Sequence, residues 1–599
     1  MSRTCVRIGN SSGYYGDRLS AMREMLEGGD LDYLTGDYLA ELTMLILGRD
    51  QMKDPALGYA KTFIRQMTDC MGLAKDKGVR IVTNAGGLNP AACAARLRDL
   101  AAAQGLDINI AHIEGDDLRQ RAEEFAFNDA LGGQTLTANA YLGAFGIAEA
   151  LGAGADVVVT GRVTDASVVV GPAIAHFGWG REDFDALAGA VVAGHVIECG
   201  TQATGGNFSG FGSLQLRQAG FPIAEVAADG SAVITKHADT GGAVTVDTVT
   251  AQLVYEVSGP TYLNPDVTTY LDTMSVTQSG DDRVAISGVT GSAPPDTTKV
   301  CLNALGGFRN SVEFILTGLD IDAKAALINA QMEAALAALD IGPDSIEWQL
   351  DRTDVEDPET QAAATTLLRC HVKSTNPDAV GRAFSSAAVE LALASYPGFT
   401  MTRQPAAGTP FGVYRPAYVP QSEVPHVVVL EDGSRLAVNT PTVTVTASGA
   451  NSRSLGSENR KSAPLGGKTP LREVADTVRK PLGNIAYARS GDKGGDANVG
   501  VWIPADHPQR EAAYAWLEGL LTAETVKQLL PEAAPLDIEI HPFSNLFAVN
   551  IVIHGLLGDG VAASTRFDPQ AKALGEWIRA RHVAIPVGLC PRDLTKEEI

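Results

Sequence analysis

The sequence has 599 residues, of which 45% are hydrophobic and 20% charged, a composition typical of globular proteins and long enough for several domains. Its 47 basic and 71 acidic residues give a formal net charge of −24. Binding to a nucleic-acid duplex or to anionic lipid requires a basic surface, so this charge argues against both. The 63 glycines and the low aromatic content favour an α/β enzyme with many tight turns.

The seven cysteines occur singly, without a Cys-x-x-Cys pair, which argues against a disulfide framework and a zinc knuckle. The N-terminal segment lacks the apolar stretch of a signal peptide. The most apolar long segment, 140–160, contains Glu149 and Asp156 and is too interrupted to cross a bilayer. We therefore expect a cytoplasmic protein, and a homo-oligomer on base rates.

Residues 1–245 alternate between short apolar strands and amphipathic helices, which predicts an α/β domain on a mostly parallel sheet. In chain order, the predicted elements are a strand at 5–9, a helix with Asp17 as its N-cap, a helix over 60–74, a strand at 79–83, a helix from Pro90, a strand at 108–113, a helix over 141–151 and a strand at 155–160.

Residues 246–450 are predicted to form an α+β domain, with strands at 244–257 and 275–289 where polar and apolar residues alternate. From residue 298 the elements follow the β-α-β-β-α-β order of ferredoxin-like folds. The predicted members are strands at 299–304 and 311–317, a helix over 328–339, strands at 345–350 and 366–373, a helix over 380–391 and a strand at 398–402.

A polar segment without periodicity, 451–480, is predicted to be a linker. The ferredoxin-like order then returns in 481–599, which predicts a second ferredoxin-like domain at the C-terminus. Its predicted elements are strands at 485–488 and 498–503, a helix around 513–520, strands at 536–540 and 547–553, a helix over 571–578 and a strand at 583–586.

Four polar or glycine-rich loops follow predicted strands of the first domain, at 10–18, 84–90, 114–117 and 161–167. In open α/β sheets ligands bind at the carboxyl ends of the strands, so we expect these loops to converge on one site. Their glycine spacing matches neither a dinucleotide-binding motif nor a P-loop. The candidate ligand-binding residues in these loops are Asn10, Ser12, Gly13, Gly16, Asn84, Gly86, Gly87, Arg162 and Thr164.

Each of these candidates also has a structural interpretation. The glycines suit any tight turn, and Asp17 suits a helix N-cap as well as catalysis. Asn84 is equally compatible with an Asx turn. Arg162 is equally suited to clamp a carboxylate or phosphate and to form a salt bridge with Asp165.

The segment 194–207 contains the strongest single cluster of candidate catalytic residues. His195 and Glu198 are three residues apart and face the same side of a helix, as a general acid–base pair requires. Gln202 and Asn207 follow in a loop that suits substrate binding or a simple connection. The candidate catalytic residues are His195, Glu198, Asp165 and Asp17.

The C-terminal segment 489–498 combines glycines with Arg489, Asp492 and Lys493. Such a loop can bind an anionic group through its cations and backbone amides, or it can be a solvated hairpin. We include Arg489, Asp492 and Lys493 among the candidate substrate-binding residues.

Several long motifs resemble the acyclic terpene utilisation (AtuA) family. They are VRIGNSSGYYGDRLS near the N-terminus, TNAGGLNP, TGRVTDAS, GHVIECGTQATGGN, YPGF and FGVYRPAYV. The run ARSGDKGGDANVGVW resembles the small ferredoxin-like domain often fused to that family. The resemblance covers nearly the whole chain and implies a pathway, acyclic terpene breakdown beside acyl-CoA enzymes, without catalytic residues to transfer.

Two functions are compatible with these features. The first is an enzyme acting on a carboxylate or CoA thioester by general acid–base catalysis, as a hydratase or a C–C lyase. The second is a non-catalytic subunit that docks a partner through the C-terminal domain. No cofactor is predicted and no metal site is assigned, although Asp17, Asp165, His195 and Glu198 leave a divalent metal ion open as a variant.

Overall fold

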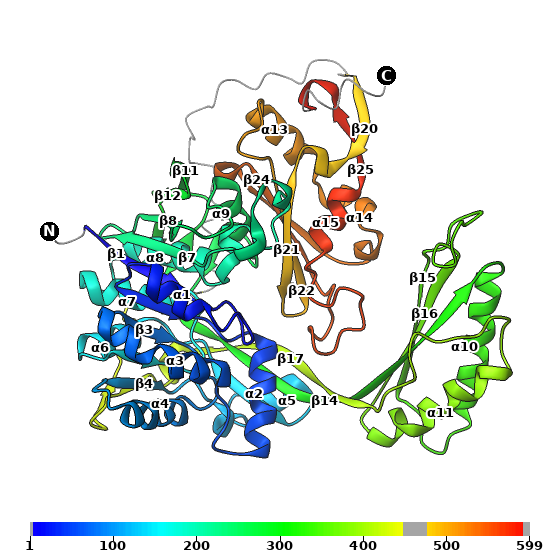
Figure 1. Cartoon of the computed structure of the whole chain (residues 1–599), viewed down its shortest axis with the longest axis horizontal. Helices are drawn as coiled ribbons and strands as arrows, with labels where there is room; N and C mark the ends of the chain where they lie inside the picture. Colours follow the sequence, from blue (N-terminus) through cyan, green and yellow to red (C-terminus); the bar gives the residue numbers. More distant parts are fainter. Residues whose placement is uncertain (1–3, 447–475, 591–599) are drawn as a thin grey trace. The chain divides into compact units, whose positions relative to one another are not determined.

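The computed structural model describes residues 4–446 and 476–590. The chain forms two compact units, shown in Figure 1. The first unit comprises Met1–Leu131, Thr135–Asn303 and Tyr414–Ile599, and the second comprises Gly132–Gln134 and Ala304–Val413. Residues 246–303, which we assigned to the middle domain, therefore pack with the N-terminal region, because their apolar side chains join its core.

The first unit is built on a mixed sheet of strand order β11-β12-β8-β7-β1-β2-β3-β6-β4-β18-β19. The central strands β1 (Cys5–Asn10), β2 (Tyr33–Gly36), β3 (Arg80–Thr83), β6 (Val157–Val159) and β4 (Ile110–Glu114) are parallel. This confirms the α/β fold class and the predicted parallel strands, to which the structure adds β2. The flanking strands are antiparallel: β7 (Pro222–Ala227), β8 (Ala232–Lys236), β12 (Arg283–Ser287), β11 (Ser275–Gly280), β18 (Val427–Val429) and β19 (Arg435–Ala437).

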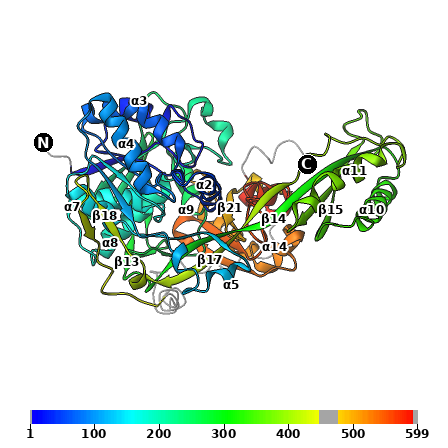
Figure 2. The same ribbon diagram turned by 90° about the horizontal axis from the view of Figure 1, so that it is seen from below.

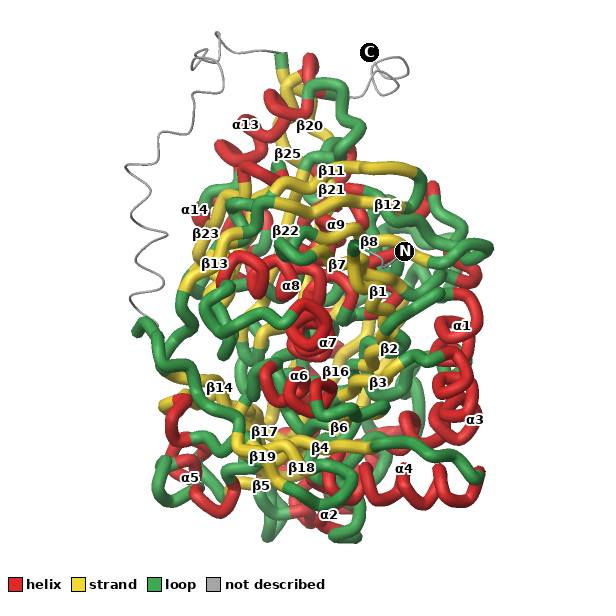
Figure 3. The backbone as a smooth tube through the Cα atoms, turned by 90° about the vertical axis from the view of Figure 1, so that its left-hand side faces the viewer, coloured by secondary structure: helices red, strands yellow, loops and turns green. Residues whose placement is uncertain are grey.

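Helices cover both faces of this sheet, as Figure 3 shows from the side. The helices α1 (Ala21–Gly28), α3 (Lys61–Lys77) and α4 (Pro90–Gln104) share one core with strand residues. The helices α6 (Phe145–Gly152), α7 (Ser167–Phe177) and α8 (Phe184–Ile197) share the other. The predicted apolar stripe of α3 is buried, and Pro90 begins α4 with Asn89 as its N-cap. Two further elements, α2 (Glu41–Lys53) and β5 (Thr135–Ala140), were not predicted.

Two local predictions in this unit are wrong. Residues 244–257 form the helix α9 (Val246–Leu253) and not a strand. Thr245 and Thr248 close a capping box at its start, and burial of the helix overrides the strand propensity of its Thr and Val residues. Asp17 is not an N-cap, because α1 begins at Ala21.

The second unit has the predicted ferredoxin-like order, with α10 (Ile321–Ala337) and α11 (Arg382–Glu390) packed on one face of a sheet of order β15-β16-β14-β17 (Figure 1). The two strands predicted at 299–304 and 311–317 are one long strand, β14 (Thr297–Thr317), because Gly307, at φ +125°, lets the backbone bend without ending the strand. The last strand is β17 (Thr409–Pro420), not 398–402. Its prolines are tolerated because β17 is an edge strand. The other strands are β15 (Ser345–Asp351) and β16 (Thr365–Ser374).

The C-terminal region forms the predicted ferredoxin-like domain with one difference. Its sheet has the order β21-β22-β24-β23, and the strands are β21 (Tyr487–Lys493), β22 (Asp496–Trp502), β23 (Ile538–Phe543) and β24 (Ala548–Ile553). The helices α13 (Arg510–Leu520), α14 (Ala523–Leu529) and α15 (Leu574–Ala580) pack on this sheet. The last strand, β25 (His582–Pro586), pairs outside the sheet with β20 (Thr477–Pro481), so β21 occupies the edge position.

Residues 451–475 of the predicted linker lie outside the described residues, and its end belongs to β20. In the described ranges, 4–446 and 476–590, no helix is both long and apolar enough to cross a membrane. The hairpin β21–β22 lies beside the N-terminal region of the first unit, as Figures 1 and 2 show. Trp502 of β22 and Ala548 of the neighbouring β24 lie in the same hydrophobic core as Val254, the C-cap residue of α9.

Candidate active site

Polar side chains from several loops gather where the parallel strands end. Asp37 follows β2, Asn84 follows β3, and Arg162 and Asp165 follow β6. The Asn84 amide donates a hydrogen bond to the Asp37 carboxyl at 2.6 Å. The Arg162 Nη1 atom donates to Asp165 Oδ1 at 2.7 Å, and its guanidinium lies 4.2 Å from the centre of the Tyr141 ring. Arg162 is buried, and the ion pair with Asp165 and the face of the Tyr141 ring hold its guanidinium in place.

The predicted pair His195 and Glu198 is formed at the end of α8, with His195 Nδ1 3.2 Å from Glu198 Oε1. His195 Nε2 lies 3.0 Å from the backbone carbonyl of Gln252 and must donate to it. Nδ1 therefore faces the glutamate across 3.2 Å, so the imidazole and the carboxyl can exchange a proton. Burial raises the pKa of Glu198 to about 7, although His195 opposes the shift. Burial opposes protonation of His195, but the charge of Glu198 outweighs it and raises the pKa of the imidazole.

Lys299 brings a second cation to the site from β14. Its Nζ lies 3.2 Å from Glu41 Oε1 and 4.9 Å from the centre of the Tyr141 ring. Burial opposes ionisation of Glu41, but the charges of Lys299 and Arg162 outweigh it and lower the pKa of Glu41 to about 2. This ion pair is therefore charged at every physiological pH.

The hairpin β21–β22 adds further charged groups from the C-terminal domain. Lys493 Nζ donates to the backbone carbonyl of Glu256 at 2.7 Å. Lys572 Nζ lies 3.4 Å from Glu256 Oε1 and 3.5 Å from Asp492 Oδ1. Burial, and next the charge of Glu256, raise the pKa of Asp492 to about 7.

We call these residues the charged cluster; its members are Asp37, Glu41, Arg162, Asp165, His195, Glu198, Glu256, Lys299, Asp492, Lys493 and Lys572. Glu41, Lys299 and Asp165 keep exposed side-chain fractions of 27%, 24% and 29%, so solvent reaches the cluster. His195 and Arg162 are almost fully buried beside them. The cluster thus combines a buried acid–base pair with groups that a small molecule can contact.

Four carboxyl groups of the cluster have raised pKa values: Asp37, Asp165, Glu198 and Asp492. The pKa of Asp37 is raised well above its ordinary value by burial and by the charge of Asp165. Because the pKa values of Glu198 and Asp492 are about 7, the negative charge of the cluster decreases as the pH falls through 7. A site of this kind favours an anionic ligand.

Arg489 attaches the C-terminal domain to the first domain. Its guanidinium donates to the side-chain oxygen of Gln202 and to the backbone carbonyl of Asn207, the latter at 3.2 Å, and lies 4.3 Å from the Tyr255 ring centre. The predicted candidates Gln202, Asn207 and Arg489 therefore contact one another. Asn207 and Glu256 both adopt positive φ, of 56°, and both present a carbonyl to a cation of β21.

The loop after β1 has structural contacts. The Asn10 side-chain amide donates to the backbone carbonyls of Ile197 and Glu198 at 2.7 and 2.8 Å, which fixes the end of α8 that carries the acid–base pair. Asp17 accepts from the backbone amides of Gly13 and Arg18. Ser12 donates to the Tyr14 carbonyl. The carboxylate of Asp17 is therefore used within its own loop.

The glycines are explained by close approach and backbone conformation. A Cβ at Gly13 would lie 2.7 Å from the backbone of Cys199, and one at Gly86 would lie 2.5 Å from the carbonyl of Thr160. Gly16 and Gly87 adopt positive φ. Thr164 bonds with Ser167, at the start of α7. These positions shape the loops and do not present polar side chains to the cluster.

The sequence analysis did not identify Asp37, Glu41, Lys299, Glu256 or Lys572. Asp37 follows a strand of only four residues, YLTG, so no strand was predicted before it. The others lie far apart in the chain and carry no motif. The available signal was the run GDYLAEL, where acidic residues follow a short apolar segment.

Cys199 and the candidate metal ligands were the remaining sources of chemistry in this region. Burial raises the pKa of Cys199 well above its ordinary value, so its thiol stays protonated, as expected for an inert cysteine. In residues 4–446 and 476–590 no three His, Cys, Asp or Glu side chains gather as a metal site would require. Asp17, Asp165, His195 and Glu198 therefore do not form such a group.

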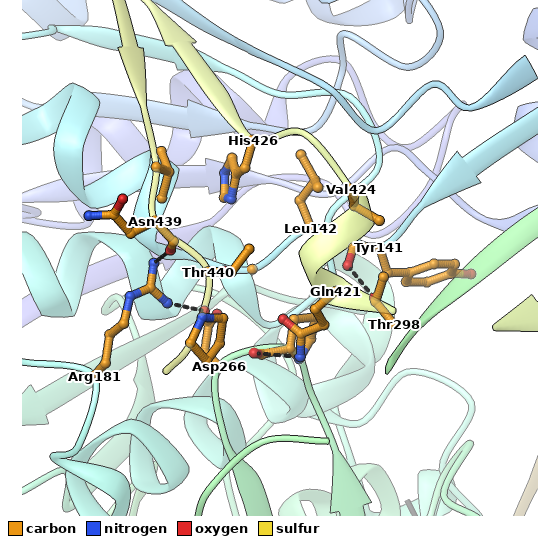
Figure 4. Close-up of a pocket in the computed structure, with 14 residues that line it drawn as sticks. Tyr141, Leu142, Arg181, Asp266, Thr298, Gln421, Val424, His426, Asn439 and Thr440 are labelled. Carbon is orange, nitrogen blue, oxygen red and sulfur yellow. Dashed lines mark hydrogen bonds and ion pairs between the residues drawn. The ribbon is translucent and has the colours of Figure 1, made fainter. Parts of the chain in front are cut away.

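A separate small pocket, shown in Figure 4, lies between the end of β5 and the segment 421–441. Its volume is about 30 Å³, enough for water but not for a substrate. Arg181 there lies 3.9 Å from Asp266, and burial lowers the pKa of His426 to about 4, so this histidine is neutral. The charged cluster is therefore the better candidate for chemistry.

The fold and the charged cluster define a class: an α/β protein whose charged, partly solvent-accessible cluster includes residues of a C-terminal ferredoxin-like domain. Residues 6–430 match the family model of the acyclic terpene utilisation family protein AtuA, and residues 480–584 match the AtuA ferredoxin-like domain. The chain belongs to the AtuA family, as the motifs predicted. No curated protein and no solved structure matches it.

Proposed function

We propose that the charged cluster is the active site of an enzyme of acyclic terpene or branched-chain acid breakdown. The family supports the pathway, and the cluster supports a carboxylate or CoA thioester as substrate. The reaction we propose is hydration–dehydration or C–C cleavage by general acid–base catalysis. The observation that carries the proposal is the His195–Glu198 pair, with imidazole Nδ1 3.2 Å from carboxyl Oε1, in the same charged cluster as the cations Arg162 and Lys299.

Both reactions pass through an enolate whose oxygen a cation stabilises. The base that forms it removes the proton next to the carbonyl in dehydration, and the proton of the β-hydroxyl group in C–C cleavage. Glu198 suits the role of the base because its pKa, about 7, lies near the operating pH and its Oε2 atom has no hydrogen-bond partner among the described residues. Arg162 and Lys299 suit the role of the cation, because both are held in place by ion pairs.

The alternative, an accessory subunit that docks a partner through the C-terminal domain, competes with a contact within the chain. The hairpin β21–β22 already bonds to Gln202, Asn207 and Glu256. This packing favours a role for the C-terminal domain in the site of its own chain.

A thermal-shift screen of the full chain tests the proposal. Branched acyl-CoA thioesters and their free acids are compared, each with divalent metals or EDTA. A ligand at a hundred times its Kd stabilises the folded protein by about 2.7 kcal/mol. The shift should disappear in Arg162→Gln and persist in the exposed control Arg352→Gln. A shift unaffected by Arg162→Gln would place the ligand elsewhere, and no shift with any ligand would favour the accessory role and require a search for a co-purifying partner.

A further inference from the structure

Three lysine amines meet in the charged cluster, and their partners differ. Lys299 pairs with Glu41 at 3.2 Å, and Lys572 pairs with Glu256 and Asp492 at 3.4 and 3.5 Å. Lys493 instead donates to a backbone carbonyl, and within residues 4–446 and 476–590 it has no carboxylate partner within ion-pair distance. Lys299 and Lys572 thus have carboxylate partners, and Lys493 has a backbone carbonyl instead.

The surroundings of Lys493 favour a neutral amine. Its Nζ lies 5.6 Å from the centre of the Tyr262 ring. Burial, and next the positive charge of Lys299, lower the pKa of Lys493, while nearby carboxylates oppose the shift. A lysine desolvated beside a second cation is an established form of activated amine. The titratable groups around the amine are Glu41, Asp165, His195, Glu256, Tyr262 and Lys299 from the first domain, with Asp492 on its own strand.

The backbone holds this amine in position. Glu256 adopts φ +56°, an unusual conformation for a residue other than glycine, and its carbonyl accepts the bond from Lys493 Nζ. Its amide donates to Asn498 Oδ1 on β22 at 2.8 Å. The same strained residue therefore contacts both strands of the hairpin, as expected where strain positions a functional group.

We propose that Lys493 is a nucleophilic amine that forms a Schiff base with an aldehyde or ketone of an anionic substrate. This inference rests on the proposed function, because it assigns a carbonyl substrate to the same proposed active site. It narrows the substrate class to oxo acids or their thioesters, and it favours C–C cleavage over hydration, since an iminium ion accepts the electron pair that cleavage releases.

The neutral Nζ attacks the carbonyl carbon, a C–N bond forms, and the π electrons move to oxygen, which takes a proton. The His195–Glu198 pair can supply that proton, because the pKa of Glu198 is about 7 and that of His195 is raised. One of the two protons on Nζ then moves to the new hydroxyl, and the C–O bond breaks as the nitrogen electron pair forms the C=N bond. The protonated imine remains, and one water is released for each carbonyl bound.

The test uses the full chain, glyoxylate as a small anionic aldehyde, and cyanoborohydride, whose hydride reduces the imine to a stable secondary amine. Peptide mass spectrometry then locates the modified lysines over time and pH. We expect Lys493 to react at least about tenfold faster at pH 7 than the exposed Lys77, because each unit of pKa lowering increases the free amine about tenfold. Lys493→Arg should remove this fast phase, and Lys77→Arg should leave it unchanged.

A second variant tests the cause. Lys299→Met removes the neighbouring cation, so the reaction of Lys493 should shift to higher pH and slow at pH 7. The proposal is overturned if Lys493 reacts no faster than Lys77, or if its pH profile matches that of Lys77. If free acids still stabilise the protein in that case, the active site stands and only the Schiff base is wrong; if they do not, both proposals fail.

Discussion

Two regions of this protein share the ferredoxin-like element order and use it differently. In the second unit, β17 is the last strand of the β-α-β-β-α-β order, and it completes the sheet at the edge beside β14. In the C-terminal domain the corresponding strand, β25, pairs outside the sheet with β20, and β21 occupies the edge.

The difference decides where the charged side chains lie. Because β21 precedes the ferredoxin-like order, it forms a hairpin with β22, and this hairpin carries Arg489, Asp492 and Lys493 against the first domain. In the second unit, comparable charges such as Arg352 and Asp322 pair at the surface. One added strand thus separates a domain whose charged hairpin packs against the first domain from one with ordinary surface ion pairs.

The largest expected effect distinguishes Lys493 from Lys373, a lysine of β16 in the second unit whose Nζ lies 5.5 Å from the Phe411 ring centre. Lys493→Met should lower kcat/KM for a substrate found in the ligand screen by about 10²–10³-fold, the usual loss when one preorganised site group is removed. Lys373→Met should leave kcat/KM unchanged. Equal losses in the two variants would remove the distinction between the domains.

The next effect concerns pH. The pKa of Asp492 is about 7 in the folded protein and about 4 in the unfolded chain. The free energy of unfolding therefore decreases as the pH rises from about 4 to 7, because the unfolded chain releases this proton more readily. Asp492→Asn should therefore be more stable than the wild type at pH 8, by up to about 4 kcal/mol, and equal to it near pH 4. Urea denaturation at a series of pH values measures both.

Asp354 of the second unit is the matched control, because its pKa is shifted in the opposite direction. Hydrogen bonds from Arg352 and Thr366 lower the pKa of Asp354 to about 2, so its contribution is present above pH 4 and is lost as pH falls toward 2. Asp354→Asn should not gain stability at pH 8. A gain in Asp354→Asn, or none in Asp492→Asn, would contradict these assignments.

A smaller effect separates two arginines. Arg489→Ala leaves the Asn207 carbonyl and the Gln202 side chain without their donor and removes the contact with the Tyr255 ring, so we expect a loss of about 3 kcal/mol. Arg352→Ala removes the ion pairs of an exposed arginine with Asp322 and Asp354 and should cost clearly less than Arg489→Ala. Urea denaturation gives both values, and similar losses would show that Arg489 is not a buried attachment.

The smallest effect contrasts two glycines of the C-terminal domain. A Cβ at Gly500 would lie 2.2 Å from Val254 Cγ2, whereas one at Gly519 on α13 meets no atom within 4 Å. Gly500→Ala should therefore destabilise the contact by about 1–3 kcal/mol through overpacking. Gly519→Ala should stabilise the protein by about 0.5–1 kcal/mol. Thermal unfolding measures both, and a neutral Gly500→Ala would mean that the hairpin and α9 can separate without cost.

Much of the fold was predictable because its signals are local. The stripe of α3, the Pro90 start of α4 and the paired residues of α8 depend on spacing along the chain, and all are confirmed. The predictions that failed did so where tertiary contacts override local preference. Burial made 246–253 a helix despite its Thr and Val residues, and an edge position admitted prolines into β17.

The sequence alone determined the parallel central strands, both ferredoxin-like regions, the family and the His195–Glu198 pair, because each depends on periodicity, short spacing or a local motif. Only the tertiary structure decided which charges meet. Glu41 and Lys299 are 258 residues apart, and Glu256 and Lys493 are 237 apart, yet both pairs are in contact. No local pattern encodes such pairs, because they form only when buried surfaces from distant segments pack together and remove the charges from water.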